Sequence, residues 1–253
     1  MKSLIFAKRT MKEILRDPLS YLFCLAFPLV MLLLMTVINK SIPPEAGMKI
    51  FNIEYLAPGI AVFGLTFVML FTCLQISKDR STALMNRLYA SPMSPVDFIA
   101  GYTLPLLLLA IAQSLVCMVA AVIVGMTTDY SFALGNLALC IVTLVPSMLM
   151  YIAFGLLFGS LLNDKAAPGI SSIIITAVSI LGGIWMDIDA MGGAIMKFCQ
   201  ALPFYHGVNA ARMAVQGNYS NMGSSLLIVG IYGVIMYLLA VIVLRVRMKM
   251  DVK

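Results

Sequence analysis

Long runs without charged residues alternate with short charged segments along this chain. Six of the runs are long enough to cross a bilayer, because about 20 residues at roughly 1.5 Å per residue span its ~30 Å hydrocarbon core. None of the runs alternates apolar and polar residues with a period of two, so the pattern favours helices over a membrane β-barrel. The predicted transmembrane helices are residues 18–39, 55–77, 98–125, 134–162, 166–186 and 223–244.

The segment before the first span, residues 1–17, has an amphipathic pattern. Its apolar residues recur on one helical face, and charged residues occupy the rest of the circumference. This pattern is typical of a helix that lies in the membrane interface, and Pro18 is expected to separate that helix from the first span. A simple membrane anchor and a docking surface for a cytoplasmic partner both fit it. The apolar positions are Leu4, Ala7, Met11, Ile14 and Leu15.

The segment between the second and third spans, residues 78–90, is polar and long enough for about two to three helical turns. Ser94, Pro95 and Asp97 follow it in the pattern of a capping box, which starts the third span. These features predict a short helix held stiffly between two spans. A purely structural hairpin fits the residues as well.

Two further features stand in the second half of the chain. Residues 193–216 are too apolar for an ordinary loop and too interrupted by polar residues and proline for a span, so we expect a pair of short helices that dip partly into the bilayer. Gly155 and Gly159 are four residues apart in the fourth predicted span, where they are expected to let two helices approach closely. Gly182 and Gly183, near the end of the fifth, suggest a similar approach.

Composition and charge agree with a membrane protein. The 253 residues are 62% hydrophobic and 11% charged, whereas soluble domains have roughly 25% charged residues. Of the 17 Lys and Arg residues, thirteen lie on the side that carries both termini and four on the other side, so the positive-inside rule places both termini in the cytoplasm. The net charge of +6 is then a topology signal and a source of contact with membrane lipids; nothing indicates nucleic acid.

The sequence carries few groups that could perform chemistry. It has no G-x-x-x-x-G-K-[ST] phosphate loop, so an ATP-driven motor would be another polypeptide. It has no G-x-S-G serine and a single histidine, His206, which argues against an intramembrane serine protease. No carboxylate or basic group lies within the six runs, where ion-coupled carriers often have one, and the five cysteines are scattered singly. We therefore expect no catalytic residue, no metal ligand and no cofactor bound by this chain.

Several motifs together resemble those of a known family. Asn86-Arg87-Leu88 and Ser91-Pro92-Met93-Ser94 lie in and after the predicted short helix, and characteristic segments follow at residues 155–160, 182–185 and 202–205. In order and spacing they resemble the permease subunits of ABC transporters of the ABC-2 type, over essentially the whole chain.

This resemblance implies an all-α integral membrane fold in one transmembrane domain, residues 1–253. Six transmembrane helices would be joined by an N-terminal interfacial helix (1–17), a cytoplasmic coupling helix (78–90) and external re-entrant helices before the last span (193–216). The implied assembly is a multi-pass permease of the bacterial plasma (inner) membrane, paired with a second permease chain, identical or different. Two copies of a cytoplasmic ATP-binding subunit would hold ATP and Mg. The residues implied to contact that subunit are Met11, Ile14, Asp79, Arg80, Asn86, Arg87 and Leu88.

The substrate is inferred from the side chains available to line a path. Apolar and aromatic residues and 20 methionines suit an amphipathic molecule better than a long hydrophilic polymer. Phe67, Phe71 and Trp185 are candidates for this path, although packing or lipid-facing roles fit them equally. We expect export of amphipathic drugs or antibiotics, with lipid or polysaccharide export as the alternative. An ATP-independent channel and a membrane scaffold are the hypotheses from other classes.

Overall fold

The computed structural model describes residues 2–43, 49–82, 93–128 and 130–250. Within these ranges the secondary structure is entirely helical, which confirms the all-α expectation for the described residues. The elements are α1 (Lys2–Ile14), α2 (Pro18–Tyr21), the π-helix η1 (Leu22–Ala26), α3 (Phe27–Ser41), the 3-10 helix η3 (Lys49–Phe51), α4 (Ile53–Ser81), α6 (Pro95–Gly125), α7 (Leu134–Leu161), α8 (Ala167–Leu181), α9 (Ile188–Met191), α10 (Gly193–Gln200), α11 (Pro203–Gln216) and α12 (Met222–Met250).

Five helices in the described residues are long and apolar enough to cross a membrane: the continuous segment Pro18–Ser41, then α4, α6, α7 and α12. The predicted span 166–186 is represented by α8, whose 15 residues reach only about 22 Å at 1.5 Å per residue. Gly182 caps α8, and Gly183 adopts a positive φ of 71°. The glycine pair therefore ends the helix. A Cβ atom at Gly182 would also lie 3.6 Å from the Phe204 carbonyl oxygen of α11, so the end of α8 approaches that helix closely, as expected.

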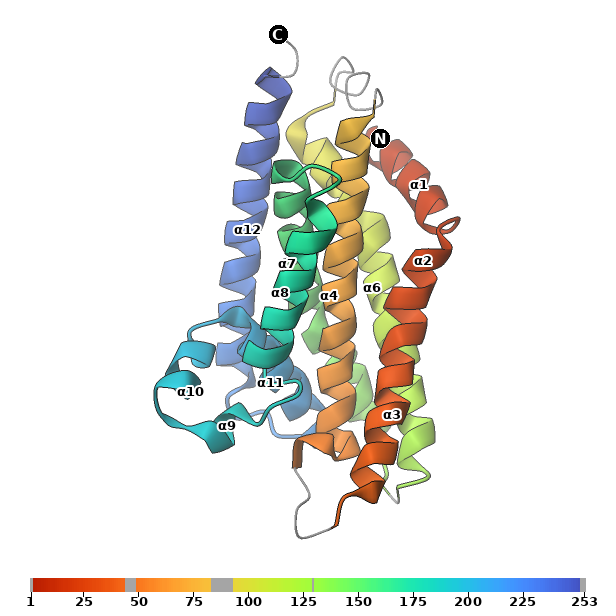
Figure 1. Cartoon of the computed structure of the whole chain (residues 1–253), viewed down its shortest axis with the longest axis vertical. Coiled ribbons are helices and arrows are strands. Elements are labelled where there is room, and N and C mark those ends of the chain that lie inside the picture. Colours follow the sequence, from red (N-terminus) through yellow and green to blue (C-terminus); the bar gives the residue numbers. More distant parts are fainter. Residues whose placement is uncertain (1, 44–48, 83–92, 129, 251–253) are drawn as a thin grey trace.

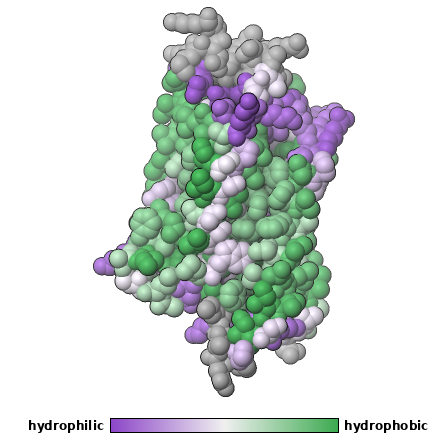
Figure 2. Space-filling view, in the orientation of Figure 1, coloured by the Kyte–Doolittle hydropathy of each residue, from purple (hydrophilic) through white to green (hydrophobic). Residues whose placement is uncertain are grey.

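The long helices form an upright bundle with α4 in its middle (Figure 1). The most apolar part of α4 is 78% buried, whereas those of Pro18–Ser41 and of α12 are only 22% and 17% buried. Both termini lie at one end of the bundle, which we call the terminal end, and α9, α10 and α11 lie toward the opposite end. Figure 2 shows hydrophilic residues gathered at the terminal end and a mainly hydrophobic body below them.

The α4–α7 contact depends on two glycines, as the sequence predicted. A Cβ atom at Gly155 would lie 2.5 Å from the Met69 carbonyl oxygen and from the Thr72 Cβ atom. At Gly159 it would lie 2.8 Å from the Cys73 carbonyl oxygen. Since real Cβ atoms do not approach that closely, only glycine lets these two backbones meet.

The N-terminal helix α1 is separated from α2 as predicted, because Asp17 caps α2 and accepts a hydrogen bond from the Leu19 amide at 3.2 Å. Of the predicted apolar face of this interfacial helix, Ala7 and Ile14 are buried within the chain, whereas Leu4 and Leu15 are 62% and 59% exposed. The buried positions are Phe6, Ala7, Thr10 and Ile14.

Phe6 packs α1 against α6. Its ring lies edge-on to Phe98 and Tyr102, with centroid separations of 5.7 and 4.9 Å. A side chain at Gly101 would overlap the Phe6 ring, so the glycine provides the space that the ring fills. Aromatic packing on α6 therefore determines which face of α1 is buried.

The segment between α4 and α6 is described only at its two ends. Residues 78–81 belong to the last turn of α4, and the rest of the predicted coupling helix 78–90, from residue 83 onward, lies outside the described residues. The predicted start of α6 is confirmed: Ser94 is its N-cap, and Ser94 and Asp97 exchange the two hydrogen bonds of a capping box.

At the opposite end, the region 193–216 forms the expected pair of short helices, α10 and α11. Arg212 on α11 donates hydrogen bonds to the Tyr55 carbonyl at 3.2 Å and to the Gly183 carbonyl at 2.9 Å. The Tyr205 hydroxyl donates to Asp189 at 2.7 Å; burial and then this bond raise the pKa of Tyr205 to about 12. These contacts fasten α11 to α9, to the end of α8 and to the start of α4.

We expect Arg212→Met to loosen this end of the bundle. The variant keeps an unbranched side chain but removes both donors, and charge-assisted hydrogen bonds contribute roughly 1.5–3 kcal/mol each. Amide hydrogen exchange measured by mass spectrometry should become at least about tenfold faster in residues 182–186, since 1.4 kcal/mol corresponds to a factor of ten. Arg245→Met, at an exposed position on α12, is the control; equal exchange rates in both variants would contradict the role given to Arg212.

Candidate functional site

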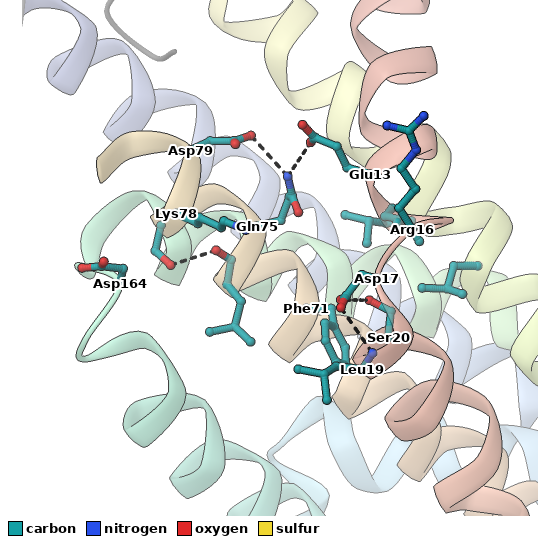
Figure 3. A pocket seen from close by; sticks show the side chains of 15 residues that line it. Glu13, Arg16, Asp17, Leu19, Ser20, Phe71, Gln75, Lys78, Asp79 and Asp164 are labelled. Carbon is teal, nitrogen blue, oxygen red and sulfur yellow. Dashed lines mark hydrogen bonds between the residues drawn. The ribbon is translucent and has the colours of Figure 1, made fainter. Parts of the chain in front are cut away.

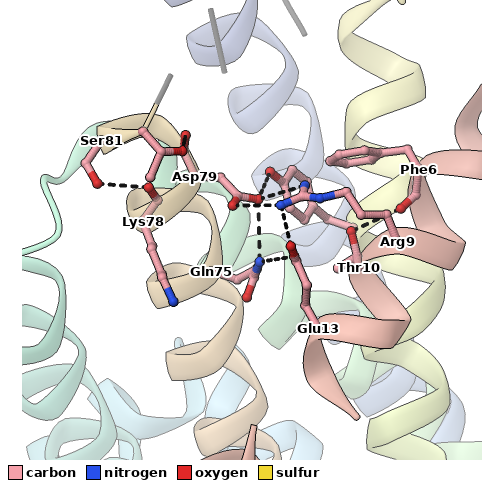
Figure 4. Close-up of polar contacts among 10 residues, drawn as sticks. Phe6, Arg9, Thr10, Glu13, Gln75, Lys78, Asp79 and Ser81 are labelled. Carbon is pink, nitrogen blue, oxygen red and sulfur yellow. Dashed lines mark hydrogen bonds and ion pairs between the residues drawn. The ribbon is translucent and has the colours of Figure 1, made fainter. Parts of the chain in front are cut away.

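A network of polar side chains joins α1 to α4 and α6 near the terminal end (Figure 4). Arg9 donates to both carboxylate oxygens of Asp79 at 3.3 and 3.2 Å and to Glu13 at 2.6 Å. Gln75 donates to Glu13 at 2.8 Å and to Asp79 at 3.5 Å. The Tyr102 hydroxyl donates to Asp79 at 2.8 Å. Asp79 is therefore the acceptor on which three helices converge.

Burial makes this network costly to disrupt. The Asp79 side chain is 7% exposed and the Arg9 side chain 29% exposed. Burial alone would lower the pKa of Arg9, but the hydrogen bond and charge of Asp79, with the charge of Glu13, hold it above its ordinary value. Arg9 thus stays charged, and α1 is fixed to α4 by a charge-assisted contact.

Arg80, the next residue of α4, ties the same helix to α7. Its Nη1 atom donates to the carbonyls of Gly159, Ser160 and Leu162 at 3.1, 2.5 and 3.1 Å. Carbonyls at a helix C-terminus lack intrahelical partners and favour a cation. The last turn of α4 is therefore held to α1 by Asp79 and to the end of α7 by Arg80.

These positions change the interpretation of several residues that we predicted to contact an ATP-binding subunit. Asp79 and Ile14 are buried within the chain, and Arg80 and Met11 are partly buried. The described contacts of Asp79 and Arg80 are internal, so any effect of these two on a partner would pass through α4. The remaining predicted contacts, Asn86, Arg87 and Leu88, lie outside the described residues.

The sequence interpretation missed Arg9, Glu13, Gln75 and Tyr102 as parts of this network. The charged residues of segment 1–17, Arg9 and Glu13 among them, were expected only to occupy the part of the helix outside its apolar face. One signal was available: Arg9 and Glu13, like Gln75 and Asp79, stand four residues apart and so share a helical face.

A cavity of about 720 Å³ lies beside the network, between the α1–α2 junction, α4, α6 and the segment after α7. This volume is within the range of small-molecule sites. Figure 3 shows Asp17, Gln75, Lys78 and Asp164 around it. Its ionisable lining residues are Glu13, Arg16, Asp17, Lys78, Asp79 and Asp164, and its apolar ones are Ile14, Leu19, Phe71, Leu74, Leu106 and Leu109.

Aromatic rings lead from this cavity along α4. Phe63, Phe67 and Phe71 are spaced by four residues and so share a helical face. Phe23 stands between Phe71 and Phe67, with centroid separations of 6.4 and 5.8 Å. Phe67 and Phe63 are 5.3 Å apart, and Phe63 and Trp185 are 5.4 Å apart.

We call this set, Phe71, Phe23, Phe67, Phe63 and Trp185, the aromatic series. The three candidates from the sequence, Phe67, Phe71 and Trp185, all belong to it, and Phe23 and Phe63 were missed. Of the five, only Phe71 lines the cavity. A role in substrate contact stays a prediction.

The described residues offer little else for chemistry. No group of three or more His, Cys, Asp or Glu side chains in them could hold a metal ion. The five cysteines are free and buried. His206 lies within α11, where its ring nitrogens contact the Gln200 carbonyl at 2.8 Å and the Ser225 hydroxyl at 3.3 Å. It joins α10, α11 and α12.

The long apolar helices and the hydrophobic body define a multi-pass membrane protein. The family model described as "ABC-2 type transporter" matches residues 2–215, so the chain belongs to the ABC-2 type transporter family. It is also similar to the Bacillus subtilis (strain 168) protein named "Putative transport permease YvfS", with 22% identity over 213 residues, 82% of each chain. The chain is accordingly a transport permease subunit of an ABC transporter, a class that works with an ATP-binding subunit.

Proposed function

We propose that this chain is the membrane half of an ATP-driven exporter that moves amphipathic drugs or antibiotics out of the cell. The observation that carries the proposal is the cavity near the terminal end, which is lined by both ionisable and apolar side chains and includes Phe71, the first ring of the aromatic series. An amphipathic molecule could place its polar part against the ionisable side chains and its apolar part against Phe71. The rings of the series then offer further apolar contacts along α4.

The charge distribution supports an inward-facing cavity. Thirteen of the 17 Lys and Arg residues lie on the side of the termini, which by the positive-inside rule faces the cytoplasm. The cavity then opens on the side where ATP is available. In this proposal the membrane is the bacterial plasma membrane, two permease chains pair, and two separate ATP-binding subunits hold ATP and Mg.

The contacts around the last turn of α4 suggest how a partner could drive transport. The predicted coupling helix, residues 78–90, is the expected docking site for the ATP-binding subunit, and its first residues belong to this turn. Because Asp79 and Arg80 fasten the turn to α1 and to α7, a displacement of the docking segment would move these helices together. The aromatic series lies on α4 and would move with them, so access could change from one side to the other.

Drug-stimulated ATPase activity tests the cavity and the series. The complex with the ATP-binding subunit would be reconstituted in nanodiscs and titrated with a panel of amphipathic drugs. For Phe71→Ala we expect the half-stimulating drug concentration to rise about tenfold, because removing ring contacts worth about 1.4 kcal/mol weakens binding by that factor.

Phe158→Ala is the matched control, because Phe158 is also partly buried and stacks on Phe154 of its own helix, outside the series. Phe67 is 7% exposed, so Phe67→Leu keeps most of its apolar volume while removing the ring. An unchanged response in both Phe71→Ala and Phe67→Leu would rule out the proposed path.

Lipid export is the second candidate. Arg16 and Lys78 stand with carboxylates in the cavity rim, and such mixed charges also suit a zwitterionic headgroup. A response to phospholipids without any response to drugs in the same assay would favour this candidate.

A further inference from the structure

The outer face of α1 holds a second, shallower feature. A groove of about 390 Å³ is lined by Ile5, Lys8, Arg9, Lys12, Glu13 and Arg16. Four of these six side chains are cationic and one is anionic. The groove therefore offers a strongly basic surface on the side of α1 that faces away from α6.

Three of its cations form no ion pair in the described part of the chain, although Glu13 also lines the groove. Lys8, Lys12 and Arg16 are exposed, and they take part in none of the hydrogen bonds and ion pairs that α1 makes with α4 and α6. Arg9, in contrast, is bound to Glu13 and Asp79. Lys8, Lys12 and Arg16 recur every four residues and so form a single stripe of like charges, which repel one another unless an anion lies between them.

The apolar residues beside the stripe indicate what kind of anion lies there. Leu4, Ile5 and Leu15 are 62%, 71% and 59% exposed, and Leu19 and Leu22 continue this apolar surface with exposures of 55% and 52%. The surface passes into Pro18–Ser41, a helix apolar and long enough to span a bilayer. A soluble acidic partner would match the cations but leave these leucines in water, whereas a phospholipid has both a phosphate and acyl chains.

We propose that the groove on α1 binds the headgroup phosphate of an anionic phospholipid from the membrane leaflet at the terminal end. Lys8, Lys12 and Arg16 contact the phosphate, and the exposed leucines and Ile5 contact the acyl chains. Arg9, which also lines the groove, holds Asp79. The bound lipid thus fixes the helix to which the last turn of α4 is attached.

Native mass spectrometry of the purified chain tests this proposal without ATP or a drug, so it is independent of the proposed function. The protein would be exchanged into detergent with phosphatidylglycerol or phosphatidylcholine, and bound lipids would be counted. The wild type should retain phosphatidylglycerol in preference to phosphatidylcholine. In the triple variant Lys8→Gln, Lys12→Gln, Arg16→Gln that retention should fall at least about tenfold, because each surface cation contributes to the attraction.

A second triple variant with the same loss of charge is the control: Lys49→Gln, Lys165→Gln, Lys197→Gln, at exposed positions outside the groove. It should retain phosphatidylglycerol as the wild type does. Thermal unfolding of both variants establishes that they are folded. Equal retention by the wild type and the groove variant, an equal loss in the control, or displacement of the lipid by millimolar inorganic phosphate would each overturn the proposal. A groove variant that retains phosphatidylglycerol but no longer assembles with the ATP-binding subunit would also overturn it.

Discussion

Replacing Asp79 with asparagine is expected to destabilise the protein by about 2 kcal/mol and to lower its melting temperature by about 4–8 °C. The variant keeps the size of the side chain but removes the charge on which Arg9, Gln75 and Tyr102 converge. Breaking a fully buried ion pair costs roughly 3–5 kcal/mol, and the smaller figure allows for the Arg9 side chain, which is 29% exposed. A thiol-reactive dye suits the measurement, because the free cysteines are buried until the chain unfolds.

Two further variants isolate the Arg9–Asp79 contact. Asp164→Asn removes an exposed carboxylate from the cavity that Asp79 also lines, and it should leave the melting temperature unchanged. The double variant Asp79→Asn, Arg9→Gln should lose less unfolding free energy than the sum of the losses in the two single variants. The reason is that Arg9→Gln removes the charge that Asp79→Asn leaves unpaired. Strict additivity would show that the contact contributes nothing.

Replacing Gly155 with alanine is expected to have the second large effect, a destabilisation of about 2–3 kcal/mol. The added methyl group would lie 2.5 Å from the Met69 carbonyl oxygen and the Thr72 Cβ atom. Both belong to α4, the most buried long helix, so neither can move without separating α4 from α7. The melting assay with the thiol dye measures this change directly.

The same helix supplies the control. A Cβ atom at Gly135, near the start of α7, would meet nothing within 4 Å, so Gly135→Ala should be neutral or slightly stabilising, as expected from helix propensity. If Gly155→Ala melts at the wild-type temperature, the close contact of α4 with α7 is not as tight as described.

The sequence was a good guide to features determined by local composition. The charge-free runs coincide with α4, α6, α7 and α12, because hydrocarbon excludes charge along the whole length of a helix. The Ser94 capping box and the close approach at Gly155 were also predicted, since each depends on residues within a single turn or on one small side chain.

Features that depend on distant partners were harder to predict. The face that α1 packs against α6 is determined by the fit of Phe6 against Gly101 and its neighbours on α6, and no local pattern contains that information. Arg9 and Asp79 are 70 residues apart, so their pairing requires the tertiary structure. Residues 166–186 contain no charge, yet the positive φ at Gly183 ends α8 early.

The aromatic series illustrates both cases. Its members on α4 follow from a four-residue spacing that is visible in the sequence. Phe23 joins two of them from a helix whose position is determined only by folding, and Trp185 reaches Phe63 from the segment after α8. The residue types therefore suggested candidates for a substrate path, but the contacts between these rings could be identified only from the folded structure.

The most direct test of the proposed exporter is accumulation of a fluorescent amphipathic drug in inside-out membrane vesicles. The vesicles would contain this chain with its ATP-binding subunit, this chain alone, or that subunit alone. We predict accumulation against a gradient only when both subunits and ATP are present. Drug movement through the chain alone and without ATP would contradict the account and indicate a channel, and a chain that neither assembles with the subunit nor moves any drug would indicate a scaffold.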